Sequence, residues 1–425
     1  MASSVHSSED LLFSVLVQLI IMIAAARTLN IVARRLGQPG AVGEIIAGLL
    51  LGPSLLGALA PALSLQLFGA TPAPAVTIIS QIGLTLLMFQ IGMEFEFAHL
   101  DTPQHRKGAA LIAGASVAVP LLAGLGFGWF SAAALAPGID PTLYALFCGN
   151  AMAITALPIL GRILAQFGLT DRPLGVVAIA AAAVNDVAGW VLLASISALA
   201  AARFSGADLA LQLAGIAALL IIARLVLAPL ARRLVAALPP VAGRIDPTLM
   251  AAMLALVFGL AICTYKLGIF AIFGGFLAGL IMHRHTGFVA AWKGQVGGFV
   301  LVFFLPVFFT YTGLRTNLLG LGLADLAWLA LILVLAIAAK IIPVYAAARA
   351  SGYTPAQAAV LGSLMNTRAL MELIVLNIGR DLGVLPPAVF TMLVVMAVAT
   401  TIMTGPLLKW LLPRTGHVIP QGVEA

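Results

Sequence analysis

The sequence predicts an all-α polytopic membrane protein, and three features carry that prediction: the composition, the long apolar segments, and the position of the few charges inside them. Of the 425 residues, 62% are hydrophobic and only 9% are charged, and the mean hydropathy is +1.13. A soluble domain has about 25% charged residues, so this composition excludes a water-soluble fold. The 42 glycines suit close helix packing in lipid, where van der Waals contact brings helices together.

Thirteen segments are candidate membrane spans. A spanning helix needs about 20 mostly apolar residues, and charged, proline and glycine clusters divide the chain into segments of that kind. We expect residues 1–415 to form one membrane transport unit and 416–425 a short cytoplasmic tail. The candidate spans are 11–35, 40–57, 76–97, 108–133, 141–166, 173–200, 208–237, 247–265, 269–284, 290–313, 324–349, 355–379 and 386–412.

The basic residues predict the orientation of the chain in the membrane. The first residues, MASSVHSSED, are acidic, and Arg27, Arg34 and Arg35 follow the first apolar segment, so this helix is expected to be retained with its N-terminus outside. Thirteen spans then place the C-terminus in the cytoplasm. Sixteen of the 22 Lys and Arg lie at cytoplasmic ends in this arrangement, as the positive-inside rule requires. Because the basic residues stand in short loops between apolar segments, no nucleic-acid partner is expected.

Two of the segments are interrupted at similar depths. Segment 141–166 contains Thr155 and Pro158 midway, and the proline lacks an N–H and clashes with a carbonyl of the preceding turn, so the helix should break there. Segment 355–379 carries the polar run 366–368 at a comparable place. The two interrupted segments are seven spans apart. An odd number of spans reverses the direction in which the chain crosses the membrane, so we predict inverted repeats. Paired broken helices point to a transporter's binding site near the midplane.

Few ionisable groups lie deep in the predicted spans. Asp186, preceded by Asn185, is at the centre of the sixth, Lys340 is two-thirds along the eleventh, and Arg368 and Glu372 lie just past the middle of the twelfth. A charged group at the bilayer centre costs about 2.5–3.5 kcal/mol on insertion scales. Groups retained there at such a cost are expected to be functional.

Asp186 is the candidate carrier of a proton or of a dehydrated monovalent cation. Removal from water disfavours its charged form and a nearby cation favours it, so the proton and the cation compete for the carboxylate. Carbonyls freed around Thr155, together with its hydroxyl, can offer neutral oxygens to an alkali cation. One carboxylate with neutral oxygens suits a monovalent ion better than a divalent one. The alternative is a structural aspartate capped by Asn185 or Lys340.

The remaining polar features have competing interpretations. Lys340 can pair with Asp186, bond the amide of Asn185, or snorkel near a helix end. Arg368 can neutralise the carbonyl dipoles of a half-helix, and Glu372, four residues later, can simply be its partner. The glycines of GLGFGW (124–129) resemble a nucleotide loop, but no strand precedes them, so they are expected to pack helices. Without a catalytic, zinc or Walker signature in suitable context, neither an enzyme nor a cofactor is expected.

Five stretches in chain order resemble the cation:proton antiporter-2 family, and together they cover essentially the whole chain. The last three are similar to its plant cation/H⁺ exchanger branch and to bacterial relatives. The stretches are PGAVGEIIAGLLLGPSLLG (39–57), LMFQIGMEFEF at the end of the third span, NAMAITALPILGRIL (150–164), AAAVNDVAGW (181–190) and LMNTRALMELIVLNIG (364–379).

This resemblance implies a homodimeric antiporter that exchanges a monovalent cation, Na⁺ or K⁺, for H⁺ by alternating access, in what we expect to be a bacterial inner membrane. It implies a mobile core domain, including about 108–200 and 324–412, with two crossing broken helices, and a dimerisation domain from the remaining helices. Asp186 would carry the proton and the cation in turn, and Thr155 would belong to the unwound ion site. Lys340 would be the basic partner of the residue before the aspartate.

Two departures from the family pattern matter. Electrogenic relatives have Asp-Asp where this chain has Asn185-Asp186, so one proton is expected to exchange for one cation without net charge movement, unless Lys340 also titrates. Potassium-efflux members carry a C-terminal nucleotide-binding domain that is absent here, so gating by nucleotide or glutathione is not expected. A cation-coupled symporter of a small organic anion and an ion channel are the alternative classes.

Overall fold

The computed structural model describes residues 2–69, 74–93, 103–170, 172–201 and 206–418. Within these ranges the regular structure is helical and there is no β-strand. The α-helices are α1 (Ala2–Arg35), α2 (Gly40–Leu51), α3 (Leu56–Leu59), α4 (Pro61–Phe68), α5 (Pro74–Met93), α6 (Pro103–Leu135), α7 (Pro141–Ala153), α8 (Leu157–Gln166), α9 (Pro173–Ala201), α10 (Gly206–Ile222), α11 (Ala228–Ala237), α12 (Pro247–Lys266), α13 (Ala271–Met282), α14 (Thr286–Trp292), α15 (Leu305–Leu314), α16 (Leu323–Ala350), α17 (Pro355–Met365), α18 (Leu370–Asp381) and α19 (Pro387–Leu411).

Four shorter helical segments connect or extend these helices. Three are π-helical, with hydrogen bonds that span one residue more than those of an α-helix, and one is a 3₁₀ turn after α19. They are η1 (Ala223–Leu227), η2 (Lys293–Gly297), η3 (Val300–Phe304) and η4 (Leu412–Thr415).

In the described part of the chain, ten helices are long and apolar enough to cross a membrane, or eleven if the bent pair Thr286–Gly297 and Val300–Leu314 is counted as one span. The predicted number of thirteen spans is therefore not confirmed. The other two predicted spans, 141–166 and 269–284, hold shorter helices because a break divides the first and the second contains only the 12 residues of α13. Of the predicted third span and the predicted tail, residues 94–97 and 419–425 lie outside the described residues.

Two compact units share the chain. The larger contains Ala24–Gln66, Phe97–Ile196 and Thr312–Ala425, and the smaller contains Met1–Ile23, Leu67–Glu96 and Ser197–Tyr311. Most of the predicted core domain falls in the larger unit, which also includes Ala24–Gln66. The division into a mobile core and a dimerisation domain stays a prediction.

Small residues bring the helices of the smaller unit together. A Cβ added at Gly275 of α13 would lie 2.3 Å from the carbonyl oxygen of Thr85 in α5, and one at Gly279 would lie 2.3 Å from that of Phe89. The Phe89 ring in turn meets the Trp292 ring edge to face, with centroids 4.8 Å apart. The packing follows the small-residue rule for membrane helices, in which backbones come into direct contact.

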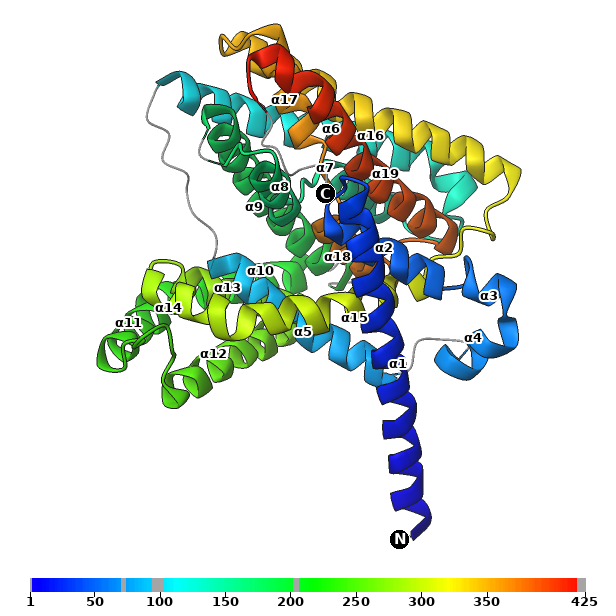
Figure 1. Cartoon of the computed structure of the whole chain (residues 1–425), viewed down its shortest axis with the longest axis vertical. Coiled ribbons are helices and arrows are strands. Elements are labelled where there is room, and N and C mark those ends of the chain that lie inside the picture. Colours follow the sequence, from blue (N-terminus) through cyan, green and yellow to red (C-terminus); the bar gives the residue numbers. More distant parts are fainter. Residues whose placement is uncertain (1, 70–73, 94–102, 171, 202–205, 419–425) are drawn as a thin grey trace. The chain divides into compact units, whose positions relative to one another are not determined.

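Small residues also allow α6 and α7 of the larger unit to pack closely (Figure 1). A Cβ added at Gly124 would lie 2.6 Å from the carbonyl oxygen of Cys148, and one at Gly128 would lie 2.4 Å from the Cα of Ala145. The glycines of the GLGFGW motif therefore pack helices, as the sequence predicted. Helix α16 packs against α6, α17 and α19, and so collects the interrupted helices into one bundle.

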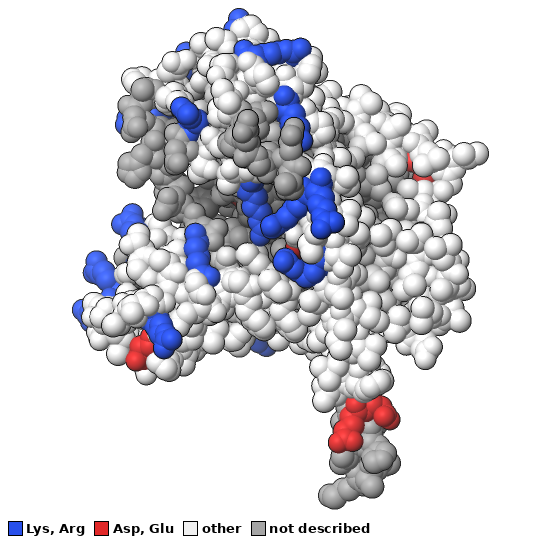
Figure 2. Space-filling model, in the orientation of Figure 1, with Lys and Arg blue, Asp and Glu red and all other residues white. Residues whose placement is uncertain are grey.

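The surface agrees with a lipid environment. Large apolar side chains such as Leu211 and Phe130 are about three-quarters exposed, at 75% and 74%. Figure 2 shows a surface that is mainly uncharged, on which the basic side chains gather in groups. Such exposure of apolar area is expected where helices face hydrocarbon.

Two glycines of α6 provide a test of this packing. Gly128→Ala should destabilise the protein by about 1–3 kcal/mol, because the new methyl group has no space against α7. Gly126→Ala is the matched control, since a Cβ there meets nothing within 4 Å and alanine is the better helix former. Thermal unfolding in detergent measures both variants. Equal unfolding temperatures would contradict the close contact between α6 and α7.

Candidate ion site

The candidate site is built around two interruptions in membrane helices. Helix α7 ends at Ala153, Ile154 is extended with φ −67° and ψ 144°, and α8 begins at Leu157 with Pro158 as its second residue. In the second interruption α17 ends at Met365 and α18 begins at Leu370. Both predicted breaks are thus confirmed, and Figure 1 shows the pairs in green (α7, α8) and orange (α17, α18).

The two interruptions are hydrogen-bonded to each other. The backbone N–H of Ala156 donates to the carbonyl of Thr367 at 3.0 Å, and the hydroxyl of Thr155 donates to the carbonyl of Met365 at 3.1 Å. Each break thereby satisfies polar backbone groups that the other leaves without a helical partner, which a low-dielectric interior requires. The prediction of two crossing broken helices is confirmed.

Asn185 joins α9 to the first break and to α6. Its Oδ1 accepts a 3.0 Å hydrogen bond from the backbone N–H of Thr155, and its Nδ2 donates to the hydroxyl of Ser116 at 3.1 Å and to the Ser116 carbonyl at 3.3 Å. The side chain is 1% exposed. The amide therefore holds the unwound loop in position, and it places the next residue, Asp186, beside that loop.

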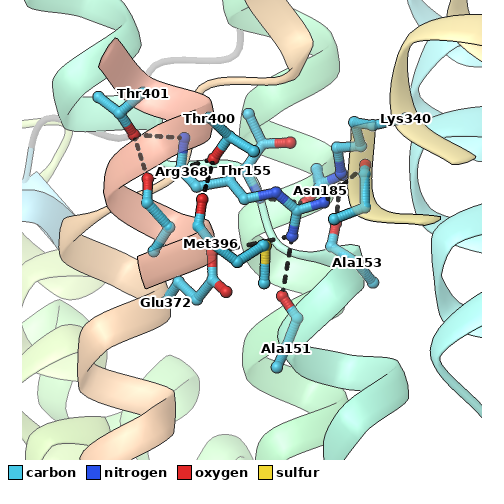
Figure 3. Close-up of polar contacts among 12 residues, drawn as sticks. Ala151, Ala153, Thr155, Asn185, Lys340, Arg368, Glu372, Met396, Thr400 and Thr401 are labelled. Carbon is cyan, nitrogen blue, oxygen red and sulfur yellow. Dashed lines mark hydrogen bonds and ion pairs between the residues drawn. The ribbon is translucent and has the colours of Figure 1, made fainter. Parts of the chain in front are cut away.

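Lys340 reaches the end of the first half-helix from α16. Its Nζ donates to the carbonyl of Ser116 at 2.7 Å and to the carbonyl of Ala153, the last residue of α7. These carbonyls, and not the Asn185 amide, are its hydrogen-bond partners, and Figure 3 shows Lys340 beside Ala153. Lys340 is fully buried, so the snorkelling interpretation is wrong. Its charge instead meets the negative end of the α7 dipole.

Arg368 performs a similar task from the second break. Its Nη1 donates to the Ala151 carbonyl in the last turn of α7 at 3.1 Å, and its Nη2 donates to the Ala336 carbonyl in α16 at 3.3 Å. The carboxylate of Glu372 lies 3.7 Å from Nη1, so the predicted pair is present, and both side chains are fully buried. The backbone N–H of Arg368 donates to the Thr401 hydroxyl of α19 at 3.3 Å (Figure 3).

Asp186 differs from Lys340, Arg368 and Glu372 because its carboxylate has no ion pair or hydrogen bond of ordinary geometry among the described residues. It is 3% exposed, and neither carboxylate oxygen accepts a hydrogen bond of ordinary geometry from the described residues. The backbone N–H of Leu157, at the start of α8, and the ammonium of Lys340 act on it electrostatically. Burying a carboxylate with so few donors is costly unless a ligand or a proton compensates it. The arrangement suits a group that exchanges one for the other.

The Thr155 hydroxyl can contribute to the same ligand. Its hydrogen points to the Met365 carbonyl, so lone pairs on the oxygen remain available to accept or to coordinate. The hydrogen bond from the backbone N–H of Thr155 to Asn185 places Thr155 next to the residue that precedes Asp186. The structure thus gathers Thr155, Asn185 and Asp186 at one break, and Lys340 at its edge.

Several polar residues of the site were not predicted. Asn150 and Asn366 are fully buried, and neither amide has a hydrogen-bond partner among the described residues, while Ser116 accepts from both Asn185 and Lys340. The position of Asn366 in the polar run of the second break was a usable signal. Ser116 and the α19 threonines stand in apolar segments, where a single hydroxyl often bonds its own helix backbone, so the sequence held no sign of their role.

The fold and the site define the class: a multi-pass membrane transporter with two crossing broken helices around a buried carboxylate. Residues 19–414 match the family model described as "Sodium/hydrogen exchanger, transmembrane". The chain therefore belongs to the sodium/hydrogen exchanger family.

Individual relatives agree with this membership. The chain is 38% identical over 414 residues to the Na⁺/H⁺ antiporter NhaS4 of Synechocystis, covering 96% of this chain and 99% of that protein. It is 35% identical over 401 residues to the cation/H⁺ antiporter 18 of Arabidopsis thaliana, covering 92% of this chain and 48% of the plant protein. The sodium proton antiporter MjNhaP1 from Methanocaldococcus jannaschii has the same fold, with a TM-score of 0.62 at 16% identity over 94% of this chain and 97% of that one.

Backbone strain at the second break supports a further prediction. Ala369 has φ 84° and ψ −108°, in the region that favours glycine, and is fully buried. Such strain costs about 1–3 kcal/mol, whereas a new glycine costs about 0.4–1 kcal/mol through the unfolded chain. Ala369→Gly should therefore raise the unfolding temperature. Ala346→Gly, at an exposed position of α16, should lower it. The same sign for both substitutions would show that Ala369 is not strained.

Proposed function

We propose that this protein is a secondary active antiporter that exchanges a monovalent cation, Na⁺ or K⁺, for H⁺ across a membrane by alternating access. The observation that carries the proposal is the buried carboxylate of Asp186, open to a ligand beside an unwound, hydrogen-bonded loop. The relatives reported above are named as antiporters for Na⁺ or cations and H⁺, which favours exchange over the symporter and channel alternatives.

The charges around the site favour Asp186 as the exchanging group. Arg368 is paired with Glu372, and Lys340 is held by two backbone carbonyls at the end of α7. Among these charged side chains of the described structure, Asp186 alone has neither an ion pair nor a hydrogen bond of ordinary geometry. A cation with its carbonyl and hydroxyl ligands, or a proton, would neutralise it in turn.

The two compact units suggest how the site gains access to each side of the membrane. Every residue of the candidate site belongs to the larger unit, from Ser116 on α6 to Thr401 on α19. The site can therefore move with that unit without being taken apart, in the rigid-body manner of inverted-repeat transporters. In this scheme the smaller unit belongs to the dimerisation domain of a homodimer. The N-terminus faces outside and the C-terminus the cytoplasm, in a bacterial inner membrane.

Replacing the carboxylate tests the proposal. Asp186→Asn keeps the shape of the side chain and removes its titration, so exchange should fall to background while the protein still folds. The measurement is proton movement in proteoliposomes driven by a gradient of Na⁺, K⁺, Li⁺ or Rb⁺. Asp325→Asn is the control, because Asp325 caps the exposed start of α16 and asparagine can cap as well.

The outcomes of this experiment are distinct. Full exchange by Asp325→Asn with none by Asp186→Asn supports Asp186 as the carrier. Exchange by purified Asp186→Asn at the wild-type rate would refute that role and direct attention to Glu372, the other fully buried carboxylate of the site.

The stoichiometry is a second prediction. Asn185 is neutral, so the site has one open carboxylate, and one proton should exchange for one monovalent cation. Each net charge moved across 100 mV corresponds to about 2.3 kcal/mol, so a one-for-one exchanger should be indifferent to membrane potential. Valinomycin-clamped proteoliposomes and solid-supported-membrane currents measure this. A sustained transport current would mean that a second group titrates, and Lys340 would then be the residue to replace.

A further inference from the structure

A cavity lies at one end of the larger unit, where three of its helices begin. The cavity, of about 630 Å³, is lined by residues from the first turns of α6, α9 and α17, from the α16–α17 turn, and from the segment after η4. The positive-inside prediction places this end in the cytoplasm. None of the lining residues is assigned to the ion site, and the proposed exchange does not use the cavity.

The side chains that line the cavity are suited to an anion. Arg172, His105 and His417 can each present a positive charge or a donor, and Gln104 and Gln357 add amide groups. The described lining residues include no acidic side chain. The Oε1 atom of Gln357 accepts from the backbone N–H of Thr354, which leaves its amide nitrogen as a donor.

The helix starts strengthen this preference. Helices α6, α9 and α17 have 33, 29 and 11 residues, and the positive ends of their dipoles meet at the cavity. Gln104 and His105 are the second and third residues of α6, and Leu174 is the second of α9. Backbone N–H groups at these positions have no partner within their own helix and commonly bind phosphate.

A buried hydroxyl gives independent support for a ligand. Tyr353 lines the cavity and is 4% exposed, and its hydroxyl has no hydrogen-bond partner among the described residues. Burial raises the pKa of Tyr353, so the hydroxyl remains a neutral donor. A buried hydroxyl without a partner costs about 1–3 kcal/mol, and an acceptor oxygen on a ligand would recover that free energy.

His417 closes one wall of the cavity. Its Nε2 lies 2.9 Å from the carbonyl oxygen of Phe167, so this nitrogen carries the proton and donates. The bond ties the segment after η4 to the turn between α8 and α9. The other ring nitrogen remains for a ligand, as an acceptor when the ring is neutral and as a donor when it is protonated.

We propose that this cavity binds a soluble organic phosphate. Its volume is in the range of small-molecule sites, about 300–1,000 Å³, and exceeds what a bare phosphate fills. The phosphate would meet Arg172, the histidines, the Tyr353 hydroxyl and the helix starts, and the amides would meet the organic part. Since α9 carries Asp186 and α17 leads into the second break, a ligand that bridges their first turns would couple binding here to the state of the transport unit.

Binding to the purified full-length chain tests this proposal without any ion gradient, so its failure is distinct from failure of the proposed exchange. ADP is the probe. Adenosine, which lacks the phosphates, and inorganic phosphate, which lacks the organic part, are the matched compounds. ADP should raise the unfolding temperature and bind measurably by calorimetry, and adenosine should do neither. Inorganic phosphate should bind at least tenfold more weakly, a difference of about 1.4 kcal/mol.

Substitutions locate the binding. Arg172→Gln should weaken ADP binding at least tenfold, and Lys107→Gln, which removes an exposed charge from the same end of α6 outside the cavity, should leave it unchanged. Tyr353→Phe keeps the ring and removes only the unpartnered hydroxyl, so it should weaken ADP binding without lowering the unfolding temperature of the free protein.

Four results with these compounds and variants would overturn the proposal: no ADP binding by the wild-type chain, equal binding by Arg172→Gln and Lys107→Gln, equal affinity for ADP and adenosine, and equal affinity for ADP and inorganic phosphate. A lipid source is tested in nanodiscs. ADP affinity should be the same in phosphatidylcholine and in phosphatidylglycerol bilayers. Loss of ADP binding in phosphatidylglycerol would mean that a lipid headgroup occupies the cavity, and it would refute the soluble ligand.

Discussion

The rest of the structure depends on how the broken end of α7 is satisfied inside the membrane. An interrupted helix leaves carbonyls that water cannot reach, and each one is costly in a low-dielectric interior. Here Lys340 binds the carbonyl of Ala153 and Arg368 that of Ala151, while Asn185 accepts from the N–H of Thr155. Four helices must converge for these contacts to form, so the interruption organises the bundle around it.

The two cations also explain why the site has an open carboxylate. Backbone carbonyls compensate the charges of Lys340 and Arg368, and Glu372 also pairs with Arg368. Neither cation therefore forms an ion pair with Asp186 in the described structure. A direct Lys340–Asp186 ion pair would compete with a proton or a cation for the carboxylate. The carbonyls of α7 and α6 thus hold Lys340 and leave Asp186 without an ion pair in the described structure, as the proposed exchange requires.

The sequence alone predicted the membrane class, the two helix breaks and the charged residues of the site. A proline inside a helical segment and charged residues inside an apolar segment can both be recognised in the sequence. The sequence was insufficient for the contacts of Lys340, since two backbone carbonyls have no sequence signature. The count of thirteen spans is not confirmed, because α13 and the half-helices α7 and α8 have only 12, 13 and 10 residues and are each shorter than a membrane span. Ser116 was missed because its carbonyl, as well as its side chain, does the binding.

The contact of α6 with α7 at Gly124 and Gly128 limits the motions open to the site. At these two glycines backbone lies against backbone without a side chain between them that could change rotamer, which disfavours sliding of α7 along α6 by the small steps of a shear motion. In the proposed exchange the half-helix and α6 would therefore move together, and the residues proposed to bind the ion would keep their arrangement while access changes.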